Sequence, residues 1–201
     1  SNGFYLSGRP NFTFDPLFHA GTYYVQEASS MFVAWIASQL IHAPITMLDL
    51  CAAPGGKSTA LRSVLPKGSL LFCNEPMSQR ANILAENVQK FGHPDMVVTN
   101  NFAADYRKSG LQFDVILADV PCSGEGMFRK DAGAIAEWSE ANVEHCWRLQ
   151  REIIADIWPR LKPGGLLIYS TCTWAPEENE EIVDWLLENY SLELVEISKI
   201  N

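Results

Sequence analysis

The sequence predicts an α/β protein built on a mostly parallel, doubly wound sheet. Two observations predict it: short apolar runs alternate with segments of helical periodicity, and turn-forming or polar residues separate them. The 201 residues, 47% of them hydrophobic, are enough to bury one substantial core. We therefore expect one domain over residues 26–201, preceded over residues 1–25 by an irregular segment that is the remnant of an N-terminal extension.

The individual elements follow from spacing. Met31, Trp35 and Leu40 recur at helical intervals and predict a helix over 26–40, and the run after it predicts a buried strand over 46–50. The alternation continues with helices over 57–65, 78–91, 142–161 and 177–189 and with strands over 69–74, 96–99, 113–119 and 166–170. LKPGG reads as a turn before the last strand, and Pro176 with three early acidic residues marks the start of the last helix.

Composition and charge exclude several classes of protein. A net charge of −9 argues against a self-sufficient nucleic-acid binder, because affinity for phosphates comes largely from Lys and Arg. No run approaches the roughly 18 apolar residues of a membrane span, and the N-terminus does not resemble a secretory signal, so we expect a soluble, cytoplasmic protein. Five cysteines without a CxxC pair fit neither a disulfide framework nor a zinc site, and we expect no metal.

A Gly-rich turn over Asp49–Ser58 follows the first strand and opens a helix. Free backbone N–H groups and the helix dipole favour an anionic ligand group there, although Gly55 and Gly56 would also suit a simple tight turn. Glu75 closes the next strand, at the position that accepts hydrogen bonds from ribose hydroxyls. Together these features indicate a cofactor that contains a nucleoside.

Two nucleotide-binding motifs that this segment does not fully match narrow the choice of cofactor. The phosphate-binding loop GxxxxGK[ST] is matched at Gly56, Lys57 and Ser58, but Cys51 stands where its first glycine belongs, which disfavours ATP. The GxGxxG fingerprint of dinucleotide sites is also missing, which disfavours NAD. S-Adenosylmethionine, with one adenosine and one carboxylate, fits the remaining features.

Two cysteines stand directly after apolar, strand-like runs. Cys122 lies in ADVPCSGEGMFRK and Cys172 in YSTCTWAPEENE. Because strand ends are where open α/β sheets carry reactive groups, the two thiols are expected to meet and to support covalent catalysis by sulfur. A purely structural role for both is the alternative, but their polar surroundings disfavour it. Cys51, Cys73 and Cys146 read as core or incidental, and the indoles of Trp138, Trp147 and Trp158 as packing residues.

In this order and separation, DLCAAPGGKS, DVPCSGEGMFRK and STCTWAPEENE resemble the signature segments of the Nop2/Sun (RsmB/RsmF-like) family of RNA cytosine carbon-5 methyltransferases. FDPLFHAGTYYVQEASSM also resembles that family, and the likeness spans about residues 14–185. The sequence GEGMFRK is most similar to that of the bacterial RsmF-type branch, which modifies 16S ribosomal RNA. The resemblance implies a Rossmann-like class I S-adenosylmethionine-dependent methyltransferase that forms 5-methylcytosine in RNA.

The resemblance also implies residue roles. Cys172 would attack cytosine carbon 6 and Cys122 would assist release, although DNA cytosine methyltransferases attack with the Pro-Cys cysteine, so the residues alone leave the two roles open. From the residues themselves, Asp119 at its strand end is expected to pair with ring nitrogen 3 or the exocyclic amine of the base, the alternative being a cap of the following turn, and Asp49 is expected to order the Gly-rich turn. The resemblance implies that Lys57 lies at the active site, the alternative being a solvated lysine in the first turn of the helix. Cofactor contacts are expected from Cys51, Ala52, Ala53, Pro54, Gly55, Gly56, Lys57, Glu75, Arg80, Asn101 and Asp119.

The expected partner is RNA, either 16S ribosomal RNA or the small subunit, bound by a monomer. The target base has to leave its stack, so single-stranded or distorted RNA is expected. Flanking RNA-binding segments of the family are not recognised in these 201 residues, which predicts weak methylation by this chain alone. An RNA-binding or ribosome-assembly module without turnover is the alternative, and a nucleotide hydrolase is disfavoured by Cys51.

Overall fold

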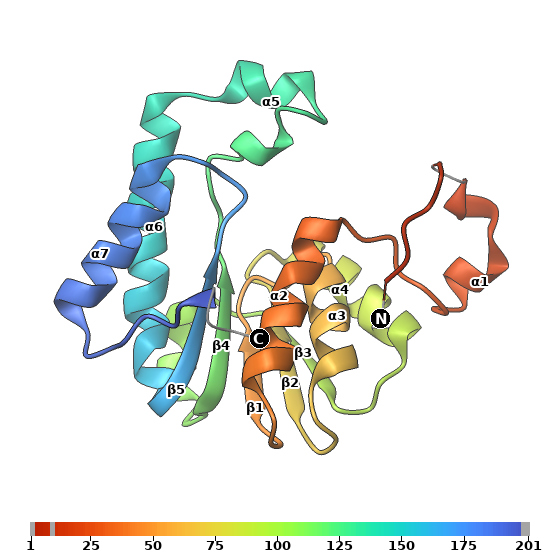
Figure 1. The fold of residues 1–201 in the computed structure, drawn as a ribbon, viewed down its shortest axis with the longest axis horizontal. Coiled ribbons are helices and arrows are strands. Elements are labelled where there is room, and N and C mark those ends of the chain that lie inside the picture. Colours follow the sequence, from red (N-terminus) through yellow and green to blue (C-terminus); the bar gives the residue numbers. More distant parts are fainter. Residues whose placement is uncertain (1–2, 9–10, 198–201) are drawn as a thin grey trace. The chain divides into compact units, whose positions relative to one another are not determined.

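The computed structural model describes residues 3–8 and 11–197 of the chain. It divides into two compact units, residues 1–100 and residues 101–201, which are described separately. Each unit contains parallel strands flanked by helices, as Figure 1 shows for the whole chain. No helix among the described residues is long and apolar enough to cross a membrane.

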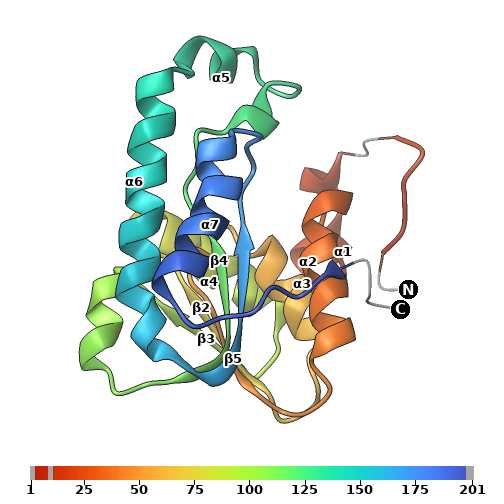
Figure 2. The same ribbon diagram turned by 60° about the vertical axis from the view of Figure 1, so that its left-hand side comes forward.

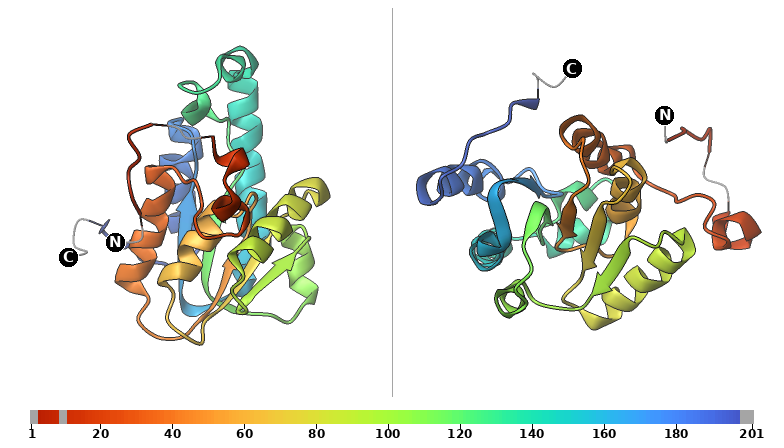
Figure 3. Two further views of the ribbon diagram at one scale, coloured as in Figure 1. Left: turned by 90° about the vertical axis from the view of Figure 1, so that its right-hand side faces the viewer. Right: turned by 90° about the horizontal axis from the view of Figure 1, so that it is seen from below.

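Three parallel strands form the sheet of the first unit. Strand β2 (Leu70–Asn74) lies between β1 (Thr46–Asp49) and β3 (Met96–Thr99), with Phe72 opposite both Leu48 and Val97. The helices of this unit are α1 (Pro16–His19), α2 (Ala28–Leu40), α3 (Gly56–Val64) and α4 (Ser78–Phe91), after a 3-10 turn over Phe12–Phe14. Helices α2 and α3 pack side by side and α4 lies along β3 (Figure 3).

The core of the first unit is made by the strands and the inner faces of α3 and α4. Met47, Leu48, Leu61, Leu71 and Leu84 are fully buried. Parallel strands that helices cover on both faces are continuous apolar runs in the sequence. This explains why the bounds of the strands could be predicted from the sequence almost to the residue. Strand β3 and helix α4 have the predicted bounds, and β1, β2 and α3 differ from theirs by one residue at either or both ends.

The described residues before α2 include a 3-10 turn and the short helix α1, and they contact helix α4. Phe12, Phe18 and Tyr23 form an aromatic cluster with ring centroids 5.7–6.2 Å apart. Gly21 has a φ of +74°, and a Cβ there would lie 1.8 Å from the carbonyl oxygen of Lys90 near the end of α4. Only glycine lets the two backbones approach this closely.

The second unit is built on the parallel pair β4 (Phe113–Asp119) and β5 (Leu161–Ser170). Helices α6 (Glu140–Ile157) and α7 (Glu180–Asn189) lie beside each other and flank this pair (Figures 1 and 2), and α5 (Ala132–Glu137) precedes α6. Short 3-10 turns complete the unit over Ala103–Lys108, Glu125–Met127, Trp158–Arg160 and Pro176–Glu178.

Four predicted bounds in this unit are wrong, and one of them is the start of the long helix, which lies at Glu140 and not at residue 142. LKPGG is part of β5 and not a separate turn: the register jumps from Phe113 opposite Leu161 to Val115 opposite Leu166, so that the extra residues bulge, with Gly164 at a φ of +74°. The long helix ends at Ile157, because Pro159 lacks the N–H that an α-helix needs. The last helix begins at Glu180, after a 3-10 turn that places Glu178 in the interior.

The apolar face of α6 supplies a test of this packing. Ile154 is fully buried in a cluster with Ile182 and Leu186 of α7. Replacing Ile154 by Ala removes three carbons from a packed site and should lower the free energy of unfolding by about 2–5 kcal/mol. The matched Ile135→Ala change in α5, where the side chain is 55% exposed, should cost no more than about 0.5 kcal/mol. Urea denaturation of both variants measures the difference, and equal costs would contradict the assigned core.

Candidate active site

The Gly-rich turn after β1 has the conformation predicted for it. Gly55 is the residue before α3 and has a φ of +110°, which disfavours any other residue. A Cβ at Gly55 would also lie 3.2 Å from Cδ1 of Leu84. The turn is tied to the sheet, because the N–H of Ala52 donates to the carbonyl of Asn74 at 2.7 Å and the N–H of Gly55 donates to the carbonyl of Ala52 at 2.8 Å.

Asp49 orders this turn from beneath, as expected. Its side chain is fully buried at the end of β1, and the hydroxyl of Ser58 in α3 donates to Oδ2 at 2.6 Å. Around it, the turn presents mainly backbone. Ala52 and Gly56 are buried, Cys51, Ala53 and Lys57 are half-buried, and Pro54 is exposed.

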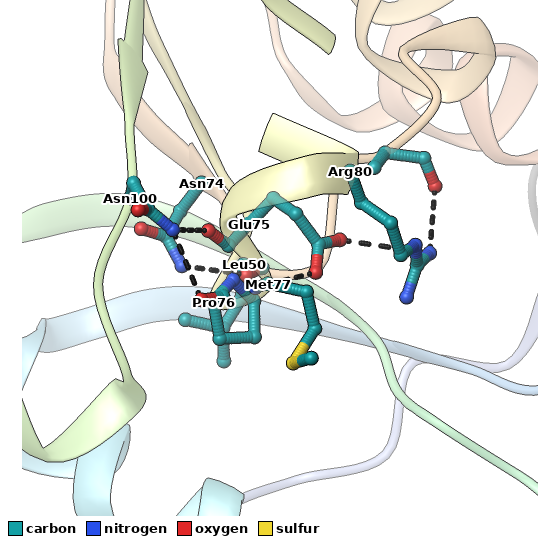
Figure 4. A network of polar contacts seen from close by, with 8 residues as sticks. Leu50, Asn74, Glu75, Pro76, Met77, Arg80 and Asn100 are labelled. Atoms are coloured by element: carbon teal, nitrogen blue, oxygen red, sulfur yellow. Dashed lines mark hydrogen bonds and ion pairs between the residues drawn. The ribbon is translucent and has the colours of Figure 1, made fainter. Parts of the chain in front are cut away.

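Glu75, directly after β2, is a fully buried carboxylate (Figure 4). Its Oε1 accepts the N–H of Met77 at 3.0 Å, and its Oε2 lies 3.5 Å from Nη2 of Arg80, which also donates to the carbonyl of Ala53 at 3.1 Å. Among the described residues no hydrogen bond reaches the buried Oε2. A carboxylate oxygen in this state can accept a ligand hydroxyl.

Two asparagines that the sequence analysis did not single out join the strand ends around Glu75 (Figure 4). Asn100 donates to the carbonyls of Glu75 at 2.6 Å and Pro76 at 3.0 Å. Asn74 donates to the carbonyl of Leu50 at 2.9 Å. Because both asparagines stand at the ends of predicted strands, the sequence could have identified them as candidates for the site. Asn101, one of the expected cofactor contacts, is half-buried and belongs to the second unit.

The two candidate catalytic cysteines meet in the second unit, as predicted. Cys122 follows β4 and Cys172 follows β5, and their Sγ atoms lie 3.0 Å apart. The backbone N–H of Cys172 also donates to Sγ of Cys122 at 3.3 Å. Cys172 is exposed and Cys122 is half-buried. Neither cysteine forms a disulfide, so this is a contact between two sulfurs without a covalent bond.

The contact makes the two thiols chemically different. Hydrogen bonding to Cys172 raises the pKa of Cys122, and burial raises it further. Cys122 therefore remains a thiol over a wider pH range than an ordinary cysteine and can donate its proton toward the sulfur of Cys172. The exposed sulfur of Cys172 is the one that a substrate can reach.

Asp119 lies at the end of β4, three residues before Cys122. The hydroxyl of Ser170, at the end of β5, donates to its Oδ1 at 2.8 Å, and the N–H of Val120 donates to the carbonyl of Ser170 at 3.1 Å. The side chain of Asp119 is half-buried. Paired strands thus hold Asp119 near the cysteine loop, where it can accept a hydrogen bond from a bound base.

Glu178 was predicted only as an acidic residue at a helix start, and its role in the site was missed. Its side chain is fully buried and accepts the backbone N–H of Ser123 through both oxygens, at 3.2 and 3.1 Å. The amide of Gln150 in α6 donates to Oε2 at 2.6 Å. Ser123 follows Cys122 and Glu178 follows the Cys172 loop, so one carboxylate joins both loops to helix α6.

Gln150 and Tyr169 complete the buried network. Gln150, fully buried, donates to the carbonyl of Pro121 at 2.9 Å, just before Cys122. The hydroxyl of Tyr169 lies 3.1 Å from Oε1 of Gln150 and 2.7 Å from the carbonyl of Glu178. Burial, and after it the charge of Glu178, raises the pKa of Tyr169, which keeps this hydroxyl a donor.

A second set of contacts binds the cysteine loops to each other. The N–H of Gly126 donates to the carbonyl of Cys172 at 2.7 Å, and a Cβ on Gly126 would lie 2.6 Å from that oxygen. The hydroxyls of Ser123 and Thr173 are 2.9 Å apart. This close approach explains why the second glycine of the GEG sequence, Gly126, has no side chain.

The remaining cysteines and tryptophans agree with their predicted packing roles, with one exception. Cys73 and Cys146 are buried, and burial raises their pKa values to about 12 and about 11. Trp147 packs under Arg151 and Trp158 packs on Tyr190. Trp138 is different, because its Nε1–H donates to Oε1 of Glu125 at 3.1 Å and its side chain is 37% exposed.

In the described ranges, no group of three or more His, Cys, Asp or Glu side chains could hold a metal ion.

Comparison with known proteins assigns the family. A family model described as 16S rRNA methyltransferase RsmB/F matches residues 41–201. The chain belongs to this family. The RsmB/F chain is 40% identical over 174 residues to ribosomal RNA small subunit methyltransferase F of Pectobacterium atrosepticum, a match that covers 83% of the chain and 35% of the relative. The corresponding Shewanella loihica protein is 39% identical, with 85% and 36% covered. The RsmB/F chain thus spans about a third of these relatives.

Solved structures confirm the Rossmann-like class I methyltransferase fold. NSun6 from Pyrococcus horikoshii, determined with SFG, has a TM-score of 0.79 and 27% identity and covers 94% of the RsmB/F chain and 48% of its own. A methyltransferase homolog protein from the same organism has a TM-score of 0.78 and 29% identity, with 92% and 57% covered. SFG is an analogue of S-adenosylmethionine, so the comparisons agree with the predicted cofactor. The buried Oε2 of Glu75 and the Gly55 turn fit that cofactor.

The inequality of the two thiols is testable by alkylation. At about pH 8, iodoacetamide should modify Cys172 before Cys122, because the raised pKa of Cys122 lowers its thiolate fraction and thiolates are the reactive form. Peptide mass spectrometry over time measures both rates. In Cys172→Ala the hydrogen bond is removed, so Cys122 should react faster than in the native chain. Faster native modification of Cys122 than of Cys172 would contradict the assignment.

The dependence of the site on Glu178 is tested by truncation. Glu178→Ala leaves the N–H of Ser123 and the amide of Gln150 without their buried acceptor and should lower the free energy of unfolding by about 2–5 kcal/mol. Glu177→Ala, at the exposed neighbouring position, is the matched control and should change it by less than about 0.5 kcal/mol. Chemical denaturation compares the two, and a small effect at Glu178 would show that the network does not support the loops.

Proposed function

We propose that this chain is the catalytic part of a methyltransferase that forms 5-methylcytosine in RNA, with 16S ribosomal RNA as substrate, through a covalent bond between Cys172 and cytosine. The observation that carries the proposal is the 3.0 Å contact between an exposed and a half-buried thiol at the ends of neighbouring parallel strands. Membership of the RsmB/F family and relatives named as small-subunit rRNA methyltransferases support the substrate class.

Cys172 acts first. Its thiolate adds to carbon 6 of cytosine, a C–S bond forms, and the electrons of the carbon 5–carbon 6 double bond move so that carbon 5 becomes nucleophilic. The thiol of Cys122, held 3.0 Å away, donates a hydrogen bond that favours the thiolate of Cys172 before attack. When bound, S-adenosylmethionine supplies an electrophilic methyl group.

Cys122 acts at release. Once Cys172 is a thioether, it no longer carries the charge that helps to raise the pKa of Cys122, so that pKa falls and the thiolate becomes accessible. Cys122 can then take the proton from carbon 5, the double bond re-forms, and Cys172 leaves as a thiolate. The same contact that keeps Cys122 protonated before attack therefore permits it to act as a base afterwards.

Asp119 would stabilise charge on the base. As a half-buried carboxylate at the end of β4, it can accept a hydrogen bond from the exocyclic amine of cytosine and so stabilise the base as the thiolate adds. The hydroxyl of Ser170 fixes its orientation. Lys57, in the first turn of α3, is proposed to serve the same active site.

Glu75 and the Gly-rich turn would hold the cofactor. The buried Oε2 of Glu75 accepts ribose hydroxyls, Arg80 orients this carboxylate, and backbone N–H groups at the start of α3 receive the carboxylate of the amino acid part. The net charge of −9 leaves most phosphate binding to other segments, and the relatives are about three times as long as the matched part.

Covalent trapping tests the proposed chemistry. RNA that contains 5-fluorocytidine should form a stable adduct with the native chain in the presence of S-adenosylmethionine, because fluorine cannot leave carbon 5 as a proton does. Cys172→Ala should give no adduct. Cys122→Ala should accumulate an adduct even on unmodified RNA, because release fails, and Cys146→Ala is the control that should behave as native. Denaturing gels read the result, and an adduct that survives in Cys172→Ala but is lost in Cys122→Ala would reverse the roles.

The cofactor site is tested by thermal unfolding. S-Adenosylhomocysteine at 100 times its dissociation constant should stabilise the chain by about 2.7 kcal/mol, and Mg-ATP should not. Glu75→Gln keeps an acceptor for the N–H of Met77 but removes the charge, and should weaken binding about tenfold or more. Glu86→Gln, exposed on α4, is the control. Stabilisation by ATP instead would contradict the cofactor.

A further inference from the structure

A pocket of about 590 Å³ in the second unit is lined by the first half of α6, the start of α7 and residues that follow Cys122 and Cys172. Its walls include the indoles of Trp138, Trp147 and Trp174. Trp174 stands two residues after Cys172 and is 71% exposed. Glu125, three residues after Cys122, lines the same pocket. A cavity of this size accommodates a nucleobase.

One carboxylate holds the indole of Trp138 and the backbone of Trp174. Oε1 of Glu125 accepts the Nε1–H of Trp138 at 3.1 Å, and Oε2 accepts the backbone N–H of Trp174 at 2.9 Å. Thr173 and Ala175, on either side of Trp174, are buried and anchor the backbone there. Because its backbone is anchored, the exposed indole of Trp174 is presented from a fixed point, which limits the loop ordering that binding of a flat ligand would require.

We propose that this pocket binds the base of a nucleotide next to the target cytosine, stacked on Trp174. The proposal rests on the proposed function and deepens it. The target cytosine has to reach Cys172. Trp174, in the wall of the pocket, is two residues away along the chain, so a neighbouring nucleotide of the same single strand would lie near the pocket. Bases of single-stranded RNA are bound by stacking on aromatic side chains, and every base has a face that can stack.

The polar groups of the pocket limit which base binds there. Five glutamates line it, and Lys, Arg and His are missing from its lining in the part of the chain that the structure describes. Carboxylates only accept hydrogen bonds, so they favour adenine, cytosine and guanine, whose exocyclic amines carry two N–H groups, over uracil, which has a single ring N–H to donate. The same charges repel phosphate, which keeps the backbone outside. The exposed side chains of Arg129 and Lys130, shortly after Glu125, are suited to that backbone.

The test uses short RNAs in which 5-fluorocytidine is flanked on either side by adenine, guanine, cytosine, uracil or an abasic residue. With the native chain, covalent adducts should form about tenfold faster with an amine-bearing neighbour than with an abasic one, and uracil should lie between. Trp174→Ala should abolish this preference, whereas Trp174→Phe should retain it. Trp35→Ala, which removes an indole that is 41% exposed on α2, is the matched control and should not change it.

Quenching of the pocket indoles by unmodified trinucleotides gives a readout that does not depend on chemistry. Quenching that requires Trp174 and follows the same order of bases supports the pocket, whether or not an adduct forms. Such quenching without any adduct would reject only the proposed reaction. Adduct rates that ignore both the neighbour and Trp174 overturn the pocket alone. Quenching by an arginine-rich peptide but by none of the trinucleotides also overturns it, since the five glutamates would then serve a basic protein.

Discussion

The carboxylate of Glu178 is the interaction on which the rest of the candidate active site depends. It is fully buried, it receives the N–H of Ser123 through both oxygens, and it receives the amide of Gln150. A buried acceptor with several donors is costly to disrupt, because each donor left behind loses its partner away from water. Two loops that leave different strands are thereby held in one relative position, and the contact between Cys122 and Cys172 follows from it.

That contact converts two identical side chains into groups with different chemistry. Sulfurs 3.0 Å apart cannot both ionise readily, since two thiolates would repel each other, so one thiol stays protonated and the other is available for attack. Exposure decides which, because Cys172 is open to solvent and Cys122 is half-buried. The first unit uses a related device, in which the buried carboxylate of Glu75 is anchored by its own backbone turn and by Arg80 and keeps one oxygen for a ligand.

Much of the fold could be predicted from the sequence because buried parallel strands are continuous apolar runs, and β3, β4 and α4 have the predicted bounds. LKPGG was assigned as a turn because a bulge and a turn use the same residues, and only pairing with β4 distinguishes them. Glu178 was predicted only to mark a helix start, because the donors that it accepts come from distant parts of the chain. Trp138 was taken for packing for the same reason, since its partner Glu125 lies across a loop.

The most direct test of the unequal roles is to find which cysteine carries the nucleotide. After digestion of the adduct between the native chain and 5-fluorocytidine RNA, tandem mass spectrometry locates the modified residue in the peptide. The account predicts a single modified cysteine, Cys172, with Cys122 recovered as a free thiol. A nucleotide on Cys122, or a mixture of the two, would mean that the Glu178 network does not distinguish the thiols as described.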